Sequence, residues 1–215
     1  MIPILYQDHS ILVCIKPSGV LSQPSPDCGE SMLSLLSSQC GGQVFPVHRL
    51  DRGVGGVMVF ARTARAAGAL SRAVQQGNLV KEYLCIVQGC PEELEGTYRD
   101  LLFKDSSRNK TFVVQRMRKG VKEASLSYRV LGTEGGRSLV RVQLHTGRTH
   151  QIRVQFSSRG MPLVGDRKYG GTAEEAIALW SFRLCFPHPD TGAAMAYAQA
   201  PEGGLWQPFS RQLPP

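Results

Sequence analysis

The 215-residue sequence lacks the long apolar runs that membrane-spanning segments require. A helix that crosses a bilayer needs about 20 consecutive apolar residues, and no run in this chain approaches that length. The first eight residues also lack the basic start and the long apolar stretch of a signal peptide. We therefore expect a cytoplasmic protein with no membrane partner.

Cysteines at metal-site spacing are missing as well. None of the cysteines forms a C-x-x-C pair, and no Cys/His cluster has the spacing of a zinc site. The six are Cys14, Cys28, Cys40, Cys85, Cys90 and Cys185. Because disulfides are rare inside cells, we expect reduced thiols, with Cys14 and Cys85 buried on apolar strands. No glycine-rich loop matches a Walker or dinucleotide fingerprint, and no internal repeat is evident.

Negative charge is in short supply. Asp and Glu together number 17 against 25 for Lys and Arg, which gives a net charge of +8. An excess of positive charge favours a polyanionic partner. Seven of the basic residues fall in one short stretch: Lys104, Arg108, Lys110, Arg116, Arg118, Lys119 and Lys122. Two interpretations of this stretch are open, a solvated loop and a hairpin that faces RNA.

What the sequence does contain is a series of short apolar and alternating segments. Alternation at residues 123–130 and 138–144 predicts half-buried strands. Apolar runs predict further strands at 11–15, 57–61, 83–87 and 179–186, and helical spacing predicts helices at 31–36, 64–76 and 149–159, the second capped by Thr63. Strands outnumber helices and mostly follow one another directly. This favours one α+β domain over residues 1–215, with a mixed, largely antiparallel sheet.

Asp51 is the first residue with a chemical signature. It lies between Arg49 and Arg52 on a glycine-containing loop that leads into an apolar strand. Glycines let a backbone come close to a ligand, and flanking guanidinium groups keep a carboxylate ionised, as a nucleophile or base requires. A structural aspartate paired with a neighbouring arginine is the alternative interpretation.

Residues 144–153 form the second signature, a strand, a tight turn and the start of a helix. Arg148 falls near the expected helix N-terminus, where backbone N–H groups favour an anion. His150 and Arg153 are three residues apart and share a helical face. A capped helix with ordinary surface cations would give the same pattern. Tyr83, which begins an apolar strand, is either a core tyrosine or a ring that stacks on an unpaired base.

Together, these stretches resemble the RluA-type family of pseudouridine synthases over residues 4 to 200. The similarity is carried by six motifs in the family's order. They are the opening segment at 8–20, His-Arg-Leu-Asp at 48–51, Lys-Glu-Tyr at 81–83, Gly-Arg-Thr-His-Gln-Ile-Arg at 147–153, Gly-Asp-Arg-Lys-Tyr-Gly at 165–170 and His-Pro-Asp-Thr-Gly at 188–192.

The resemblance implies a sheet in two lobes flanked by short helices, with the active cleft between the lobes. It implies isomerisation of specific uridines in ribosomal or transfer RNA, with base flipping and with neither cofactor nor metal. It also implies a catalytic domain without the small N-terminal RNA-binding domain of some relatives. We expect a monomer, because a self-contained cleft needs no second subunit.

Residue by residue, the resemblance makes Asp51 the essential carboxylate and Arg153 the arginine that pairs with it. Tyr83 matches the ring that stacks on the target base. Arg49 matches a residue that enters the RNA stack when the target nucleotide flips out. The remaining substrate contacts are assigned to His48, Arg148 and His150. Asp51 has three candidate roles: attack on the anomeric carbon, addition to the pyrimidine ring, and proton removal that gives a glycal.

The chain departs from the family's pattern at two places. Val54 and Gly55 stand where the family usually has Thr-Ser, so loop hydroxyls are missing, and Gln155 stands where a histidine is common. The first departure favours an alternative function, an RNA-binding or RNA-folding module of the same fold with little turnover. A hydrolase or nuclease that uses His48, His145 or His150 is disfavoured, because no nucleophile elbow and no metal-ligand cluster accompany them.

Overall fold

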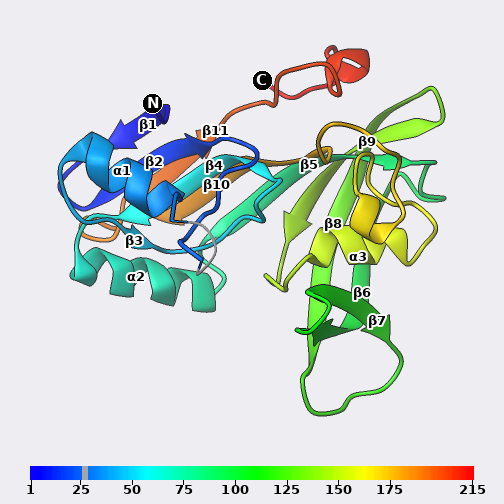
Figure 1. Ribbon diagram of the computed structural model, residues 1–215, viewed down its shortest axis with the longest axis horizontal. Coiled ribbons are helices and arrows are strands. Elements are labelled where there is room, and N and C mark those ends of the chain that lie inside the picture. Colours follow the sequence, from blue (N-terminus) through cyan, green and yellow to red (C-terminus); the bar gives the residue numbers. More distant parts are fainter. Residues whose placement is uncertain (26–28) are drawn as a thin grey trace. The chain divides into compact units, whose positions relative to one another are not determined.

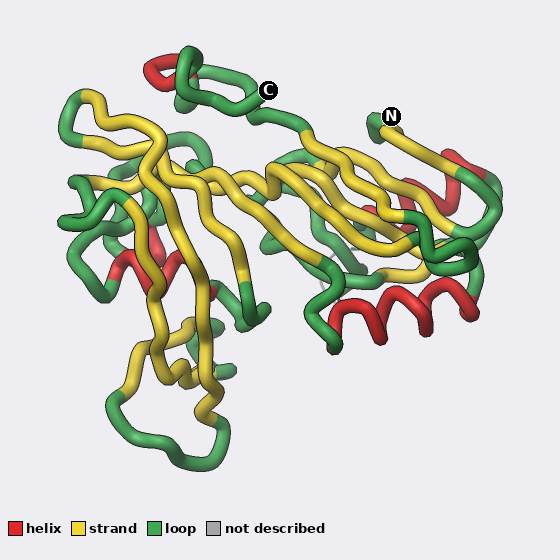
Figure 2. The backbone as a smooth tube through the Cα atoms, turned by 180° about the vertical axis from the view of Figure 1, so that it is seen from behind, coloured by secondary structure: helices red, strands yellow, loops and turns green. Residues whose placement is uncertain are grey.

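The computed structural model describes residues 1–25 and 29–215, and the chain forms two compact units (Figure 1). Unit 1 comprises Met1–Lys81, Trp180–Pro201 and Pro215, and unit 2 comprises Glu82–Leu179 and Glu202–Pro214. Strands outnumber helices in both units, as Figure 2 shows. The expected α+β fold with a largely antiparallel sheet is therefore confirmed. Within the described residues, no helix combines the length and the apolar character that crossing a membrane needs.

Unit 1 is built on a mixed group of strands in the order β1-β2-β4-β10. Its strands are β1 (Ile4–Gln7), β2 (Ile11–Lys16), β3 (Phe45–Pro46), β4 (Gly55–Ala61), β10 (Leu179–Pro187) and β11 (Ala194–Ala198). Strand β4 pairs antiparallel with β2 and parallel with β10, and β3 and β11 flank β4 and β10. Every residue of β4 is buried, which explains its continuous apolar sequence.

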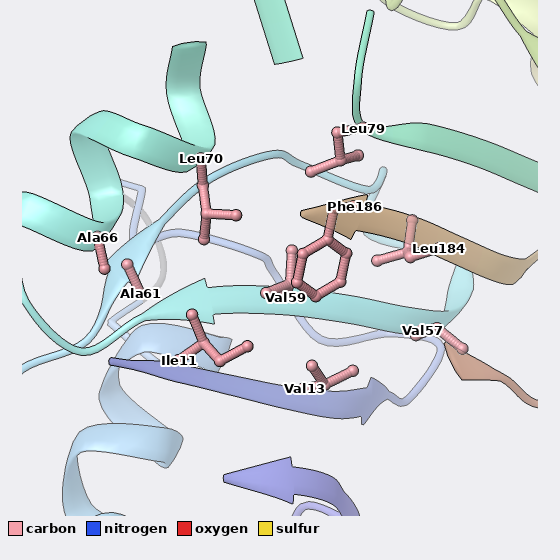
Figure 3. Packing of buried hydrophobic residues seen from close by; sticks show 10 residues of the cluster. All are labelled: Ile11, Val13, Val57, Val59, Ala61, Ala66, Leu70, Leu79, Leu184 and Phe186. Atoms are coloured by element: carbon pink, nitrogen blue, oxygen red, sulfur yellow. The ribbon is translucent and has the colours of Figure 1, made fainter. Parts of the chain in front are cut away.

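Two helices pack on this sheet. Helix α1 (Met32–Cys40) begins at a capping box formed by Ser31 and Ser34 and ends at Gly41 in the left-handed conformation. Helix α2 (Ala64–Gln75) begins at Thr63, whose hydroxyl oxygen accepts a hydrogen bond from the Ala66 N–H, as the sequence predicts. Figure 3 shows Ala66 and Leu70 of α2 pointing at β2 and β4 within the core of this unit.

Unit 2 is an antiparallel sheet whose strands follow the order β5-β9-β8-β6-β7. Its strands are β5 (Val80–Gln88), β6 (Glu95–Asp105), β7 (Lys110–Val114), β8 (Val121–Glu134) and β9 (Arg137–Leu144). The chain passes from one unit to the other within β5 and next to the start of β10. An aromatic cluster of Tyr98, Tyr128 and Phe156, with ring centroids 4.6 to 5.9 Å apart, joins the sheet to helix α3 (Gln151–Ser157).

The helix predicted at 149–159 is shorter than expected, because it begins at Gln151 and ends at Ser157. His150 adopts a left-handed conformation with φ of 54°, which a continuing helix cannot contain. Two short 3-10 helices complete the unit, η1 (Arg167–Tyr169) and η2 (Gln207–Phe209). The second carries the C-terminal segment onto unit 2, where Trp206 and Phe209 are buried.

The cysteines follow the expectation where the structure describes them. Cys14 and Cys85 are buried thiols, and burial raises the pKa of each far above its ordinary value. Cys40, Cys90 and Cys185 are free as well, and Cys28 lies outside the described residues. These two buried thiols are therefore protonated packing groups rather than nucleophiles.

Candidate active site

The loop that carries Asp51 is anchored on both sides of that residue within unit 1. The N–H of Val54 donates to the carbonyl of Asp51 at 3.0 Å and closes a tight turn. Just before the turn, Leu50 exchanges two hydrogen bonds with the buried Ser22 hydroxyl, at 2.9 and 3.0 Å. The Asp51 side chain is half-buried, whereas its neighbours Arg49 and Arg52 are exposed.

A buried lysine donates hydrogen bonds to the backbone of the same loop. Lys16 is fully buried at the end of β2, and its Nζ donates to the carbonyls of Pro17, Arg52 and Val54 at 3.0, 3.1 and 2.7 Å. Burial lowers the pKa of Lys16 to about 8, while the negative charge of Asp51 acts in the opposite direction. Lys16 therefore places a fixed cation near the Asp51 carboxylate, and the sequence motifs assigned no such role to it.

A signal for Lys16 was present in the sequence. The residues before it, 11–15, form an uninterrupted apolar strand, and a lysine that ends such a run belongs either to the surface or to a buried polar site. Sequence alone does not distinguish the two, because two of the three carbonyls that surround Lys16 come from a loop 36 and 38 residues away.

Gly55, the second residue of the unusual Val54-Gly55 pair, has a structural explanation. A Cβ on Gly55 would lie 2.4 Å from the ring of Trp180, the residue that faces Gly55 across the β4–β10 pairing. The indole of Trp180 is held by a hydrogen bond from Nε1 to the Gln199 carbonyl at 2.7 Å. The ring thus occupies the space that a serine side chain would need.

Loop rigidity comes from elsewhere in unit 1. The Ser18 hydroxyl donates to the Gly53 carbonyl at 2.7 Å. Gly19 and Arg52 exchange two further hydrogen bonds, at 2.8 and 2.9 Å. These contacts hold residues 52–53 against the segment that follows β2, so the missing loop hydroxyls do not leave the loop unsupported.

His48 supports the strand that follows the loop. Its Nε2 accepts a hydrogen bond from the Val59 N–H at 3.3 Å, which places the imidazole proton on Nδ1. Burial, reinforced by the charge of Lys81, lowers the pKa of His48 to about 3, so the ring is neutral at physiological pH. Among the described residues, the buried Nδ1 has no hydrogen-bond partner. The expected substrate contact of His48 stays a prediction.

Tyr83 and Arg153 belong to unit 2. Tyr83 lies on β5 and is 6% exposed. On α3, Arg153 donates from Nε and Nη2 to the two carboxylate oxygens of Asp166, at 2.7 and 2.8 Å. The sequence predicted an ion pair with Asp51 and did not single out Asp166, although Asp166 lies in a quoted motif. The Asp51 pairing, which joins residues of different units, stays a prediction.

Tyr169 ties three elements of unit 2 together around Arg153. The guanidinium carbon of Arg153 lies 5.0 Å from the Tyr169 ring centroid. The Tyr169 hydroxyl accepts from the Thr111 N–H at 2.8 Å and bonds to Nδ1 of His150 at 2.9 Å. The left-handed backbone of His150 is costly for a residue with a side chain, and such costs are concentrated at functional sites.

Arg148 precedes helix α3, and its side chain binds a neighbouring strand. Helix α3 starts three residues later, and the Arg148 side chain donates from Nε to the Glu123 carbonyl at 2.8 Å. The Gln151 side chain instead closes the turn, accepting from the Arg148 N–H and the Thr146 hydroxyl at 3.0 and 2.8 Å. A role for Arg148 in RNA contact stays a prediction.

The basic stretch comprises the hairpin of β6 and β7 and the segment that leads into β8, together called the basic hairpin. That it faces RNA stays a prediction. Strands β6 and β7 pair from Leu101 to Val114, and the Asp105 carboxylate accepts hydrogen bonds from the Ser107 and Arg108 N–H groups in the turn. The cations other than Lys110 are exposed: Lys104, Arg108, Arg116, Arg118, Lys119 and Lys122. Lys110 is half-buried, with Nζ 5.1 Å from the Tyr169 ring centroid.

Comparison with known protein families decides the classification. The family model described as RNA pseudouridylate synthase matches residues 10–158. The chain belongs to this family. The match covers the motifs that contain Asp51, Tyr83 and Arg153, whereas the motifs at 165–170 and 188–192 lie outside it.

Individual relatives agree with the pseudouridylate synthase assignment. The chain is 36% identical over 218 residues to an uncharacterized RNA pseudouridine synthase of Aquifex aeolicus, covering 91% of this chain and 68% of that protein. It is 32% identical over 203 residues to an uncharacterized RNA pseudouridine synthase of Synechocystis, covering 88% of this chain and 62% of that protein. The chain thus spans roughly two thirds of the length of these relatives.

Solved structures show the same fold. The human RNA Pseudouridylate Synthase Domain Containing 4 gives a TM-score of 0.78 at 21% identity, over 98% of this chain and 92% of that chain. The human RNA Pseudouridylate Synthase Domain Containing 1 also gives 0.78, at 24% identity, over 99% and 88%. At this identity the likeness establishes the architecture alone.

We predict that Gly55 and Trp180 are energetically coupled. Gly55→Ser forces a Cβ into the indole ring and should destabilise the protein by about 1–3 kcal/mol, as overpacking does. Trp180→Ala in the same chain should relieve that clash, so the double variant should be more stable than the sum of the two losses predicts. Thermal unfolding measures both. Gly68→Ser is the control, because a Cβ there meets only Arg72 Nη1 at 3.6 Å. Simple additivity of the two losses would contradict the coupling.

We predict that Lys16→Met loosens the Asp51 loop. Methionine keeps most of the volume but removes the donors of three carbonyls, and a buried polar group left unpaired costs about 1–3 kcal/mol. Hydrogen exchange of residues 50–56 should accelerate, while α2 should stay protected. Lys122→Met, on an exposed side chain, is the control.

The pH dependence of the Lys16→Met difference has a defined sign. The folded-state pKa of about 8 lies below the ordinary value of 10.5. Between these values the unfolded chain binds more protons at this lysine, so wild type should gain stability relative to Lys16→Met as pH rises through that window. Denaturant unfolding at several pH values measures the difference. A flat or falling difference would contradict the assignment.

Proposed function

We propose that this protein isomerises specific uridines of ribosomal or transfer RNA to pseudouridine, with Asp51 as the essential carboxylate. The observation that carries the proposal is the anchored loop of unit 1, which presents a half-buried carboxylate between two exposed arginines and above a buried ammonium group. Membership of the pseudouridylate synthase family supports the same reaction.

The reaction is balanced without an oxidant or a reductant. The bond between N1 of uracil and C1′ of ribose breaks, the base rotates while it is held, and C5 forms a new bond to C1′. The proton on C5 is released and N1 regains a proton. Asp51 acts by attack on C1′, by addition to the ring, or by removal of a proton from the neighbouring sugar carbon. Each route requires an ionised carboxylate from which most water is excluded.

The other candidate residues have different roles. Tyr83 holds the uracil by stacking, and Arg153 stabilises the ionised state of Asp51. Arg49, whose side chain is exposed, fills the gap that the flipped nucleotide leaves, which offsets part of a flipping cost of a few kcal/mol. His48, Arg148 and His150 contribute to substrate contact.

The basic hairpin supplies affinity for the RNA backbone. Its exposed cations lie at the end of β6, in the turn before β7, between β7 and β8 and at the start of β8, where they can lie against phosphates without a desolvation cost. Binding of this kind is independent of sequence and weakens with salt. We further propose that the protein acts as a monomer in the cytoplasm.

An RNA-binding module with little turnover is the second candidate. It rests on Val54 and Gly55, which lack the hydroxyls of the family's usual pair. The contact between Gly55 and Trp180, together with the hydrogen bonds of Lys16 and Ser18, weakens this reading, because the loop has other supports. We therefore favour the enzyme.

The central prediction is that Asp51→Asn abolishes isomerisation. Total RNA labelled with tritium at uracil C5, taken from cells that lack this protein, releases tritium only when C5 loses its hydrogen. Wild type should release it and Asp51→Asn should not, while Asp105→Asn, at the turn between β6 and β7, should behave as wild type. Carbodiimide–primer extension on the same RNA would then identify the uridine. If Asp51→Asn binds RNA and still releases tritium, Asp51 is not the catalyst. If wild type releases no tritium either, the RNA-binding module is the better interpretation.

We also predict a distinct salt signature for the basic hairpin. In an Asp51→Asn background, replacing Arg116 and Lys119 by alanine should weaken binding to bulk transfer RNA. It should also reduce the slope of log K against log salt by roughly 0.7–0.9 per lost phosphate contact. The matched control replaces Arg65 and Arg72, two exposed cations of α2. An equal loss of affinity and an equal change of slope in the two double variants would show that the hairpin contributes no more to RNA binding than α2 does.

A further inference from the structure

Among the ion pairs of the described residues, the one between Arg153 and Asp166 is among the most deeply buried. The Arg153 side chain is 12% exposed and that of Asp166 is 1% exposed. The contact is bidentate, with Nε and Nη2 each facing one carboxylate oxygen at 2.7 and 2.8 Å. Two parallel hydrogen bonds fix the plane of a guanidinium as well as its position, which a single bond does not do.

Asp166 is itself held by a tightly built turn. Its N–H donates to the Leu163 carbonyl at 3.1 Å, and its carbonyl accepts from the Tyr169 and Gly171 N–H groups at 3.1 and 2.8 Å. Gly165 has a φ of +78°, and a Cβ there would lie 1.9 Å from the Ala176 carbonyl oxygen. The turn is therefore specified by its backbone, and both carboxylate oxygens of Asp166 accept hydrogen bonds from Arg153.

Tyr169 limits the guanidinium on a further side. Its ring faces Arg153, while its hydroxyl is fixed by bonds to Thr111 and His150. A guanidinium carries five N–H groups, and the bidentate pair uses two of them. The carboxylate of Asp166 and the ring of Tyr169 thus determine where the remaining N–H groups point, and they do so entirely within unit 2.

Stability alone is a poor reason for such a pair. Taking both charges out of water carries a desolvation penalty, and apolar residues of similar volume are often as stable. Orientation is what the pair provides and an apolar replacement would not. Asp166 also lies outside the set of residues to which the family motifs assigned chemistry.

We propose that Asp166 is a positioning residue for uridine isomerisation, which acts by setting the orientation of Arg153. This inference rests on the proposed function, because it requires Arg153 to serve the Asp51 reaction. Asp166 itself touches neither substrate nor the reacting atoms.

The test compares Asp166→Asn with a matched variant, Asp100→Asn. Asp100 holds Arg159 through two oxygens at 3.0 and 3.1 Å, and Arg159 follows the same helix. Single-turnover tritium release from C5-labelled total RNA gives the rate, and filter binding of that RNA gives the affinity. Asp166→Asn should lower the rate by about tenfold or more, the scale of a small misplacement of a catalytic group. Its RNA affinity should stay within about twofold of wild type, and Asp100→Asn should keep the wild-type rate.

A double-mutant cycle separates positioning from a general structural role. If Asp166 acts through Arg153, then adding Asp166→Asn to Arg153→Gln should slow the reaction no further. Multiplying losses would overturn the proposal. So would a wild-type rate for folded Asp166→Asn, or an equal rate loss in Asp100→Asn.

Two further comparisons keep the outcome decisive. If Asp166→Asn does not fold, Asp166→Glu keeps the charge but displaces the carboxylate, so a lowered rate supports the proposal and a wild-type rate overturns it. Asp51→Asn separates the two levels of inference. Turnover by that variant removes the proposed function, whereas an inactive Asp51→Asn beside a fully active Asp166→Asn removes only the role of Asp166.

Discussion

The buried ammonium group of Lys16 is the interaction on which the Asp51 loop depends. An unpaired charge in a protein interior is strongly unfavourable, so this side chain is tolerated only because three carbonyls surround it. Two of those carbonyls, from Arg52 and Val54, belong to the four-residue turn that Asp51 begins. The requirement to satisfy one cation therefore fixes the backbone on the far side of the carboxylate, and the Ser22 hydroxyl fixes the near side.

Much of the fold could be predicted, because alternation and apolar runs report directly on which face of a strand is buried. Buried strand β4 and the Thr63-capped helix α2 are examples. The start of α3 could not be predicted in this way. His150 adopts a left-handed backbone, and its side chain bonds to Tyr169, a contact that becomes visible only when residues 19 positions apart meet. Helical spacing around His150 indicated a longer helix than the chain forms.

The candidate site shows the same division. Local order in the sequence pointed to Asp51, Tyr83 and Arg153, because each lies in a short motif. Partners that come from distant segments were not visible. Lys16 reaches a carbonyl 38 residues away, and the Trp180 ring explains a glycine at position 55. Such complementary pairs leave no periodic trace, since each residue is unremarkable until the fold brings its partner to it.

The cations of this basic chain serve two different physical purposes. In unit 2, Arg153 and Arg159 are each held by two carboxylate oxygens. The negative charge of the partner weakens the long-range field of each guanidinium, and the paired hydrogen bonds define its orientation. The hairpin cations lie in water, where they keep their mobility and attract a polyanion without fixing its register. The proposed reaction, in which a detached base rotates, needs rigid groups near the reacting atoms and adaptable groups around the RNA backbone. Net charge alone would not reveal this division, because +8 counts oriented and mobile cations equally. For that reason the acidic partners of the arginines, rather than the arginines alone, distinguish groups that position from groups that attract.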